Sequence, residues 1–365
     1  MKITVPTIDF GTSKIVTMVA QSNGERCDIV GSGAVPYSGY LQDGWNNPDE
    51  IRDVIRTAID QAQKTGNCRI HELNVGVPGM FTRVIVKEVH VSLTGPDPHV
   101  TAQDVRACFK LAEESGGDRI IHSAPAWFRV DDGKKTLSPV GIKGRELSAM
   151  IALVTADKYF IDDITYRLRD MDIEPREFYS TVAGEATYAL SQDERDKTAM
   201  LIDIGYLCTD VMVMEGDALI FHKCLDIGGG HISADIAEQL NIPFPFVEEK
   251  IKQTYSFNST NQDETYVIPA TEDEPARTVR RDEVTPIIEA KVEEIAEAIN
   301  KALEEGGVKL GKWSNVYLTG GGLILNKGGK DFLAGKLHRI IREAQRTNNK
   351  MTSHVFSSAV GLTIL

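Results

Sequence analysis

The sequence predicts an α/β protein of two domains that repeat one pattern of strand, glycine turn and returning strand. Three observations support this fold class. With 365 residues, the chain is too long for one ordinary hydrophobic core. The repeated pattern occurs at 7–20 and again at 201–225, which indicates an internal duplication. Residues 82–157 combine alternating strands with a helix, as expected for an inserted subdomain with its own core.

The first domain is expected to begin with a three-stranded meander. After the first glycine turn, 15–20 is predicted as the second strand and 27–34 as the third. A helix is predicted to start after Asn47-Pro48-Asp49, because apolar residues follow at helical spacing. These residues are Ile51, Val54, Ile55, Ala58 and Ile59. Residues 73–77 are predicted to form a buried strand that ends at Pro78-Gly79.

The inserted region should contain strands, one helix and further strands. Its strands are predicted at 84–86, 89–93, 126–130, 141–142 and 147–155. Thr101 is expected to cap its helix, with Gln103 and Asp104 in the first turn. After the insert, helices are predicted at 157–171 and 178–190.

The second half repeats the hairpin and then becomes helical. Strands are expected at 201–214 and 218–225. The polar stretch 257–279 is predicted as a loop or an irregular hairpin. A long amphipathic helix is predicted at 284–303, ending at Gly306-Gly307.

Composition excludes several classes of protein. With 42% hydrophobic and 25% charged residues, the chain is typical of a soluble globular protein. The net charge of −13 argues against nonspecific nucleic-acid binding, which needs a basic surface. None of the five cysteines forms a Cys-x-x-Cys pair, so neither structural zinc nor a disulfide framework is expected. There is no signal peptide and no apolar run of roughly 20 residues, so a cytoplasmic protein is expected.

Glycine turns after apolar strands predict a nucleotide site. A triphosphate with bound Mg²⁺ needs carboxylates for the cation and backbone N–H groups for the phosphates. Asp9 and Asp203 stand at two such strand ends and are predicted to hold the magnesium, through water. The alternative is that both aspartates simply cap turns. Because the two occur in matching contexts, the metal role is preferred.

The phosphate contacts are predicted from residue type and position. Gly11, Thr12, Ser13 and Lys14 supply N–H groups, hydroxyls and a positive charge to the β-phosphate, and Gly205 approaches it from the other side. Gly228 and Gly229 precede a helix whose N-terminus favours anions. The stretch Asp226 to Gly230 also looks like a second phosphate loop, but its position after the hairpin assigns it to a later turn.

Together these features resemble the actin-like ATPase superfamily, which includes actin, sugar kinases and heat-shock chaperones. The resemblance implies duplicated ribonuclease H-like domains with a nucleotide cleft between them. Within the superfamily the chain is similar to bacterial FtsA over nearly its full length. The matching stretches are 8–16, 74–79, 190–195, 228–237 and 359–362. The insert lies where FtsA carries its distinctive subdomain, and PilM of type IV pilus assembly shares that subdomain.

The resemblance also implies domain boundaries. The first domain is expected at 1–198, with its insert at about 82–157. The second is expected at 199–352, with a smaller subdomain at about 246–310, and 353–365 returns to the first domain.

Further site residues follow from the same resemblance. Gly320, Gly321 and Gly322 resemble the adenosine-binding turn. Glu249 and Lys252, three residues apart on a predicted helix, match an acid-to-lysine spacing that contacts ribose and base in relatives; a surface ion pair is the alternative.

Two departures from the family pattern weaken the expected catalysis. Tyr206 and Leu207 stand where relatives have two further glycines. Thr181 stands where active relatives position the attacking water, with Glu185 one turn later. Because orientation of the water carries much of phosphoryl transfer, ATP and Mg²⁺ binding is expected with at most slow hydrolysis.

The implied function is an FtsA-like scaffold of bacterial cell division that self-associates into filaments. The implied partner is FtsZ, whose tail binds the smaller subdomain of the second domain in FtsA. A PilM-like role in pilus assembly and a small-molecule kinase of the same superfamily are the alternatives, and the insert argues against the kinase. No basic apolar helix follows Gly361-Leu362, so no direct membrane anchor is expected and a partner would recruit the protein to the membrane.

Overall fold

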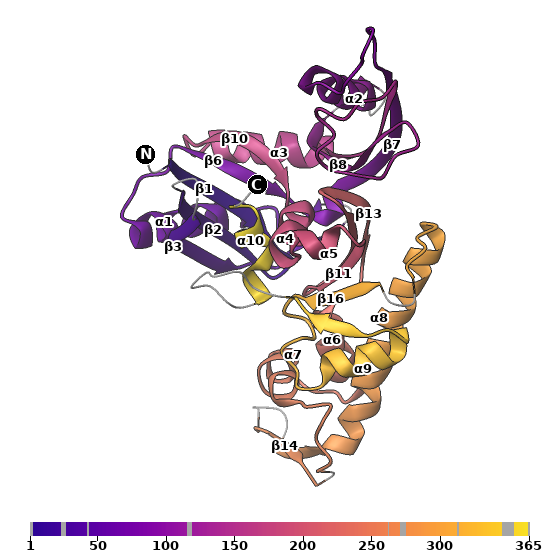
Figure 1. The fold of residues 1–365 in the computed structure, drawn as a ribbon. Coiled ribbons are helices and arrows are strands. Elements are labelled where there is room, and N and C mark those ends of the chain that lie inside the picture. Colours follow the sequence, from indigo (N-terminus) through magenta and orange to yellow (C-terminus); the bar gives the residue numbers. More distant parts are fainter. Residues whose placement is uncertain are drawn as a thin grey trace. The chain divides into compact units, whose positions relative to one another are not determined.

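The computed structural model describes residues 3–22, 27–41, 44–114, 119–261, 263–270, 275–311, 314–344 and 354–363. The chain forms two compact units (Figure 1). Unit 1 contains residues 1–201, 212–223 and 345–365. Unit 2 contains residues 202–211 and 224–344.

Unit 1 is built on a five-stranded sheet in the order β10-β6-β1-β2-β3. The first three strands along the chain form the expected antiparallel meander, and β6 and β10 add to it in parallel. The bounds are β1 Ile3–Phe10, β2 Lys14–Ser22, β3 Cys27–Pro36, β6 Glu72–Val77 and β10 Glu174–Ser180. A short pair, β4 Tyr40–Leu41 and β5 Gly44–Trp45, follows the meander.

Two helices complete the core of this sheet. Helix α1 (Ile51–Gly66) buries the predicted apolar face, and α3 (Lys158–Arg169) buries Phe160, Ile164 and Leu168. The Asp157 side chain accepts a hydrogen bond from the Tyr159 N–H, so it caps α3. Both helices share one hydrophobic cluster with the apolar residues of β1 and β6.

The helix predicted over 178–190 is partly wrong. Its first residues belong to β10, and the helix α4 (Thr181–Ala189) begins only at Thr181. Ser180 accepts a hydrogen bond from the Ala183 N–H and so sets the start of the helix. A short helix, α5 (Gln192–Arg195), follows and carries a capping box between Ser191 and Glu194.

The end of the described chain returns to the beginning of unit 1. A 3-10 turn (His354–Phe356) leads into helix α10 (Ser357–Gly361), which packs on α4 and lies beside β2 (Figure 1). Ala359 and Val360 share a small hydrophobic cluster with Val16 and Met18 of β2. Distant segments of the sequence therefore build this corner of unit 1.

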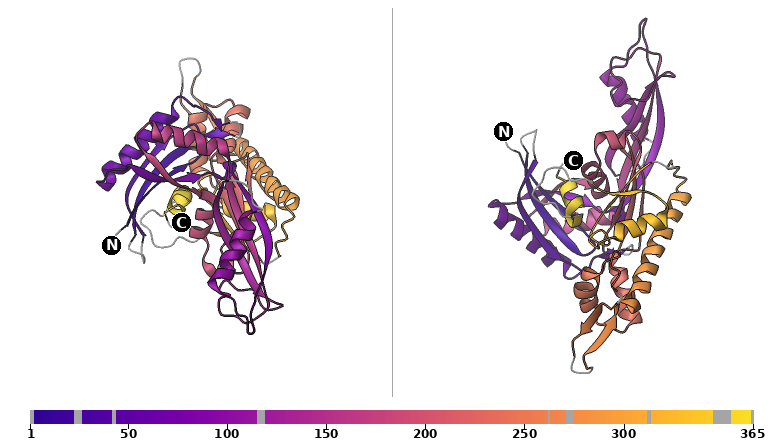
Figure 2. Two further views of the ribbon diagram at one scale, coloured as in Figure 1. Left: turned by 90° about the horizontal axis from the view of Figure 1, so that it is seen from above. Right: turned by 60° about the horizontal axis from the view of Figure 1, so that its bottom comes forward.

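The insert forms a three-stranded antiparallel sheet in the order β7-β9-β8, with helix α2 lying along one face (Figure 2). Its elements are β7 Thr82–Ser92, α2 Ala102–Glu114, β8 Ile120–Val130 and β9 Glu146–Ala156, after a 3-10 turn at Gly79–Phe81. The two strands predicted at 84–86 and 89–93 are one continuous strand, because β7 pairs with β9 without a register shift from Thr82 to Ser92. Gly141 and Ile142 lie in a turn rather than in a strand. Thr101 and Asp104 exchange the expected capping hydrogen bonds.

A second five-stranded sheet has the order β13-β12-β11-β16-β17. Its strands are β11 Ala199–Ile204, β12 Thr209–Glu215, β13 Ala218–Leu225, β16 Asn315–Thr319 and β17 Ile341–Glu343. Strands β12 and β13 form the hairpin that repeats the start of the chain. The tip of this hairpin belongs to unit 1, because Ala218 packs with Trp127 and Ala152 of the insert and the Asp217 N–H donates to the Pro125 carbonyl at 3.1 Å.

Unit 2 also contains several helices. They are α6 Gly229–Gln239, α7 Phe244–Phe246, a π-helix at Val247–Lys252, α8 Arg281–Glu305 and α9 Gly329–Leu337. Helix α8 packs against both α6 and α9. The region 257–279 contains the antiparallel hairpin of β14 (Thr265–Ile268) and β15 (Arg277–Arg280), which agrees with the irregular hairpin; residues 262 and 271–274 lie outside the described residues.

Among the described residues, no helix combines the length and the apolar character that crossing a membrane requires.

Candidate functional site

The first candidate loop, residues 9–14, closes as a tight turn between β1 and β2. The Gly11 N–H donates to the Lys14 carbonyl at 3.0 Å. A side chain at Gly11 would place its Cβ 3.0 Å from that same oxygen. Glycine is therefore favoured here, because the two backbones approach so closely.

Asp9 stands at the end of β1 as a buried carboxylate, 6% exposed. The Ser358 hydroxyl of α10 donates to its Oδ2 at 2.7 Å. Burial raises the pKa of Asp9, and the Ser358 hydrogen bond and the charge of Lys14 oppose this rise. A buried carboxylate oriented by hydrogen bonds from Ser358 and the Phe10 backbone is well suited to gain a cation, because the cation would offset the lost hydration.

The other residues of the first loop lie around this carboxylate. Thr12 is buried, whereas Ser13 and Lys14 are half-buried. The Lys14 ammonium lies 5.1 Å from the centre of the Phe356 ring, at the start of the returning segment. The segment 354–361 therefore contacts both Asp9 and Lys14 of this loop.

The second candidate loop, residues 203–210, repeats the turn of the first loop. The Gly205 N–H donates to the Cys208 carbonyl at 2.9 Å, and a Cβ at Gly205 would again lie 3.0 Å from the oxygen that accepts this bond. The duplication expected from sequence therefore extends to the hydrogen bond that closes each loop.

Three glycine turns meet within unit 2. The Gly229 N–H donates to the Gly205 carbonyl at 2.9 Å, and the Gly230 N–H donates to the Tyr206 carbonyl at 2.7 Å. The Gly322 N–H donates to the Ile204 carbonyl at 2.7 Å. The second loop, the turn that begins α6 and the turn that follows β16 thus form one layer of backbone.

The conformation of Gly320 shows why the turn after β16 requires glycine. Its φ is +88°, a region that L side chains rarely adopt. A Cβ there would overlap the Oδ1 of Asp203 and the Ile204 carbonyl. Gly322 also lies against the backbone of the second loop, and Gly321 is half-buried between them. The predicted adenosine turn and the predicted metal ligand Asp203 are therefore neighbours.

The turn before α6 is capped by a histidine. The Gly228 N–H donates to the Nδ1 of His231 at 3.0 Å. A Cβ at Gly228 or Gly229 would meet backbone atoms of the second loop or of Gly322. This assigns His231 to the start of the helix rather than to a metal site.

Tyr206 lies in this layer with its ring toward the α6 terminus. A Cβ at Gly230 would lie 3.0 Å from two carbons of the ring, and the Lys252 ammonium lies 5.8 Å from its centre. Burial and then the charge of Glu248 raise the pKa of Tyr206. The added bulk predicted from sequence is therefore packed beside the glycine layer.

The sequence predicts that Glu249 and Lys252 share one face of a helix, and the structure does not show this. The segment is a π-helix; Glu249 is exposed, whereas Lys252 is buried. Lys252 pairs instead with Glu248, at 3.2 Å, and Glu248 also accepts a hydrogen bond from the Ser233 hydroxyl. Burial lowers the pKa of Lys252, and Glu248 opposes this shift. The sequence argument missed Glu248 because it took the i,i+3 pair, whereas the observed pair is i,i+4.

Asn326 fixes this π-helix to the turn after β16. Its buried amide donates to the carbonyls of Lys252, at 2.6 Å, and Tyr255, at 3.1 Å. Lys252 thereby has a defined position within unit 2.

The two candidate catalytic residues lie on α4 in unit 1. The Thr181 hydroxyl donates to the Val77 carbonyl at 3.0 Å, and Glu185 is 2% exposed. A Cβ at Gly361 would meet the backbone at Gly184 and Glu185, so α10 lies directly against this part of the helix. Both side chains are thus enclosed by unit 1, and the Thr181 hydroxyl is already engaged.

These donor sets fit a magnesium nucleotide. Unit 1 offers a buried carboxylate, a lysine and hydroxyls, and unit 2 offers Asp203 beside closely packed glycine turns whose N–H groups donate within the protein. Carboxylate oxygens suit Mg²⁺, and hydroxyls and a lysine suit phosphate. Ser358 is the site residue that sequence reasoning missed, since nothing near it in the sequence links it to Asp9.

Two family models match segments of the chain. The family model described as "Cell division protein FtsA" matches residues 200–361. The model described as "SHS2 domain inserted in FTSA" matches residues 79–155. The predicted FtsA-type insert is thereby confirmed as part of the fold.

Curated relatives agree with the family models. The chain is 26% identical to Cell division protein FtsA of Pseudomonas aeruginosa over 320 residues, which cover 86% of this chain and 76% of that protein. It is 26% identical to Cell division protein FtsA of Bacillus subtilis over 82% of this chain and 70% of that protein.

Solved structures confirm the actin-like fold. The type IV pilus biogenesis complex PilM-PilN matches 99% of this chain and 98% of its own, with a TM-score of 0.66 and 17% identity. MreB5 of Spiroplasma citri bound to ADP matches 99% of this chain and 95% of its own, with a TM-score of 0.57 and 11% identity. With both family models and the curated relatives in agreement, the chain is similar to FtsA in sequence and has the actin-like fold.

Proposed function

We propose that this protein is an actin-like scaffold of bacterial cell division that binds ATP together with Mg²⁺. Its curated relatives carry the name Cell division protein FtsA, and the FtsA family model matches residues 200–361. The fold likeness to PilM, at 17% identity, supports the superfamily and gives the pilus-assembly role less support. MreB5, a neighbour in fold, was solved with ADP bound.

The single observation that carries nucleotide binding is the repeated turn. In both loops a strand-end aspartate precedes a glycine whose N–H closes onto the carbonyl three residues later. One such turn occurs by chance in many hairpins, whereas two in duplicated positions, one of them layered with two more glycine turns, match a phosphate cradle.

Each residue then has a proposed role. Asp9 and Asp203 hold Mg²⁺ through water, and Ser358 orients Asp9. Gly11, Thr12, Ser13 and Lys14 of unit 1 and Gly205, Gly228 and Gly229 of unit 2 lie against the phosphates. The hydroxyls and the Lys14 ammonium donate to phosphate oxygens, because the glycine N–H groups already donate within the protein. When bound, Mg²⁺ neutralises phosphate charge.

The base and ribose are proposed to lie at the turn after β16. Gly320 to Gly322 leave room for the adenosine, and Lys252 with Glu248 lines it. Glu249 keeps its proposed ribose contact only if it reaches the ligand from the exposed side of the π-helix.

Hydrolysis is proposed to be slow at most. The Thr181 hydroxyl is already donated to the Val77 carbonyl, which leaves it poorly placed to orient an attacking water. Glu185 is the remaining candidate. We therefore expect the bound nucleotide to act chiefly as a ligand that selects a conformation.

Scaffolding follows from such a selection. A bound nucleotide would favour one conformation of the protein, and that conformation would set the affinity for other copies and for a partner. The proposed partner is an FtsZ-type division protein, bound at residues about 246–310, which include the π-helix, the β14–β15 hairpin and much of α8. Recruitment to the membrane would come from a partner.

Calorimetry with Mg²⁺ and ATP tests the nucleotide site. We expect Asp9→Asn and Asp203→Asn each to weaken Mg²⁺-ATP binding by about tenfold or more, since each removes a charge that holds the cation. Asp60→Asn, at an exposed position of α1, is the matched control and should bind as the wild type does. Equal affinity in all four proteins would refute the assignment of the cation ligands.

Assembly is tested separately. Sedimentation and electron microscopy with ATP should show filaments of the wild type, and co-sedimentation with FtsZ should depend on residues 246–310. Protein that stays monomeric with and without FtsZ at high concentration would contradict the scaffold, whatever calorimetry finds.

A further inference from the structure

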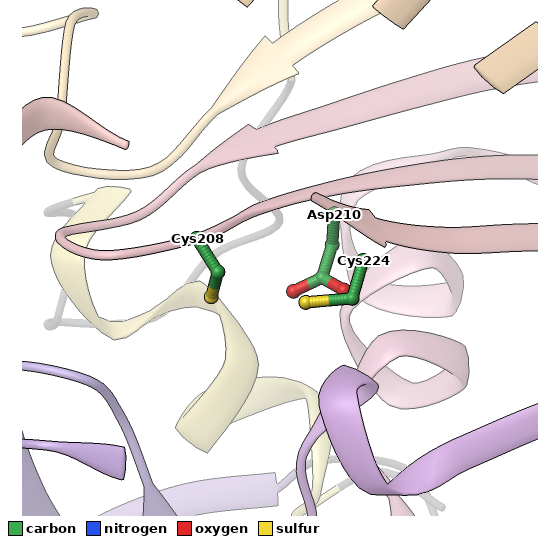
Figure 3. A group of neighbouring side chains, drawn as sticks. All are labelled: Cys208, Asp210 and Cys224. Carbon is green, nitrogen blue, oxygen red and sulfur yellow. The ribbon is translucent and has the colours of Figure 1, made fainter. Parts of the chain in front are cut away.

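Three side chains with metal-binding atoms converge beside the second loop. Cys208 lies immediately before β12, Asp210 lies on β12, and Cys224 lies near the end of β13 (Figure 3). The two sulfur atoms and a carboxylate oxygen all lie within 4.8 Å of one another. All three residues belong to unit 2, so the cluster is formed within one unit.

The cluster is sheltered from solvent. Cys208 and Asp210 are buried, each 9% exposed, and Cys224 is half-buried. In the described part of the chain, it is the one group of three or more histidine, cysteine or acidic residues with this spacing. The half-buried Cys224 leaves a side from which an ion can enter.

The chemistry of the donors selects the kind of cation. Two thiolates are soft ligands and the carboxylate is a hard one, a set that suits the borderline cation zinc, whereas Mg²⁺ takes an octahedral set of oxygens. Zinc accepts four ligands in a tetrahedron, with sulfur at about 2.3 Å and carboxylate oxygen at about 2.0–2.2 Å. At those bond lengths neighbouring ligand atoms lie roughly 3–4 Å apart, which the observed cluster meets with small side-chain movements.

We propose that Cys208, Asp210 and Cys224 bind one zinc ion, with water or another ligand in the fourth position. This site goes beyond the proposed nucleotide function and does not depend on it. The sequence argued against zinc because it contains no Cys-x-x-Cys pair. The hairpin of β12 and β13 brings together two cysteines that are distant in sequence, and no spacing motif records this.

A disulfide between the two cysteines is the other chemistry open to them. Cys208 and Cys224 share a hydrogen bond, so their sulfur atoms are near neighbours. A disulfide would use the sulfurs alone, whereas the carboxylate of Asp210 converges on the same point (Figure 3). The exposed Asp226 adds a further negative charge near Cys224. The acidic surroundings favour a cation.

A bound ion would join two segments that carry predicted phosphate contacts. Cys208 closes the turn of Gly205, and Cys224 precedes the turn at Gly228. The Thr209 hydroxyl already donates to the Ile227 carbonyl at 2.7 Å, and zinc would add a stronger link between the same segments. The site would therefore stiffen the spacing between the second loop and the α6 turn.

Metal titration of the full chain tests the proposal. After treatment with a reductant and a chelator, and removal of both, the protein should take up about one equivalent of Zn²⁺ by elemental analysis. Co²⁺ should give the near-ultraviolet charge-transfer bands of cobalt–thiolate bonds, and excess Mg²⁺ should not remove them. Zn²⁺ should also slow alkylation of Cys208 and Cys224, read peptide by peptide by mass spectrometry.

Variants separate the site from general metal binding. Cys208→Ser and Cys224→Ser should each weaken the thiolate bands and lower Zn²⁺ affinity by about tenfold or more, and Asp210→Asn should lower affinity while both thiols remain. Cys68→Ser, a half-buried cysteine of unit 1, is the control and should bind as the wild type does. Circular dichroism of each apo variant establishes that it is folded.

Two results would overturn the site. One is the absence of thiolate bands in folded, reduced wild type, or bands that persist equally in Cys208→Ser and Cys224→Ser. The other is a Cys208–Cys224 disulfide in the isolated protein, with no Zn²⁺ uptake once it is reduced.

Discussion

The two predicted phosphate loops share a turn but rest on different neighbours. The first loop depends on the end of the chain, since Ser358 donates to Asp9 and Phe356 lies beneath Lys14. The second loop depends on two glycine turns of unit 2, whose N–H groups donate to carbonyls at 204–206. Side chains support the first loop, together with the Tyr37 N–H, which donates to the Ser13 carbonyl at 3.0 Å, whereas backbone groups support the second loop.

This difference shows how a duplication can diverge without losing its turn. Side-chain support leaves room around the first loop for Thr12, Ser13 and Lys14. Backbone support requires glycine at the neighbouring turns, and the second loop carries Tyr206, Leu207 and Cys208 at the positions that Thr12, Ser13 and Lys14 occupy in the first loop. Substitutions in each region test these two kinds of support.

The largest effect is expected at the backbone layer. Gly320→Ala should destabilise the protein by about 3 kcal/mol, because a Cβ meets both a φ of +88° and the Asp203 carboxylate. Urea unfolding measures the change. Gly335→Ala is the control: no atom lies within 4 Å of that Cβ, and a helical alanine should be neutral or stabilising by up to about 1 kcal/mol. Equal unfolding free energies for wild type and Gly320→Ala would disprove backbone support.

A smaller effect is expected from the bulk of the second loop. Tyr206→Ala should tighten Mg²⁺-ATP binding by about tenfold, or about 1.4 kcal/mol, because it uncovers the α6 terminus and releases Lys252 from the ring. Calorimetry provides the measurement. Tyr166→Ala, at a position 72% exposed on α3, serves as the control. If Tyr206→Ala binds no more tightly than wild type, the ring does not restrict the nucleotide.

The smallest effect concerns the tip of the β12–β13 hairpin, which packs against the insert. Burial lowers the pKa of His122 on β8, and the charge of Asp217 at the hairpin tip opposes this shift. The unfolded chain therefore takes up this proton at a higher pH than the folded chain. The stability that neutral His122 contributes to the folded state is complete above about pH 6.5 and is lost as the pH falls below this value.

Thermal unfolding across this range tests the histidine. His122→Gln should lose less stability than wild type when the pH is lowered from about 7.5 to about 5.5. The exposed His71→Gln should follow the wild type. Parallel pH profiles for all three proteins would exclude His122 as the source.

Much of the fold could be predicted because it follows from local pattern. The α1 face, the Asp157 and Thr101 caps and the long helix α8 depend on spacing within a few turns, which the sequence states directly. The predictions from local pattern failed where contacts with distant segments set the local conformation. Residues 174–180 became strand β10 because β6 offered a parallel edge, and 247–252 became a π-helix tied down by Asn326.

The sequence by itself determined the two aspartate strands, the glycine turns, the insert and the resemblance to FtsA, because each is written in consecutive residues. Only the tertiary structure decided that Ser358 reaches Asp9, that Glu248 rather than Glu249 pairs with Lys252, and that Cys208, Asp210 and Cys224 come together. Such groupings depend on how strands pair and helices turn, and a linear pattern does not encode distances between segments that meet only after folding.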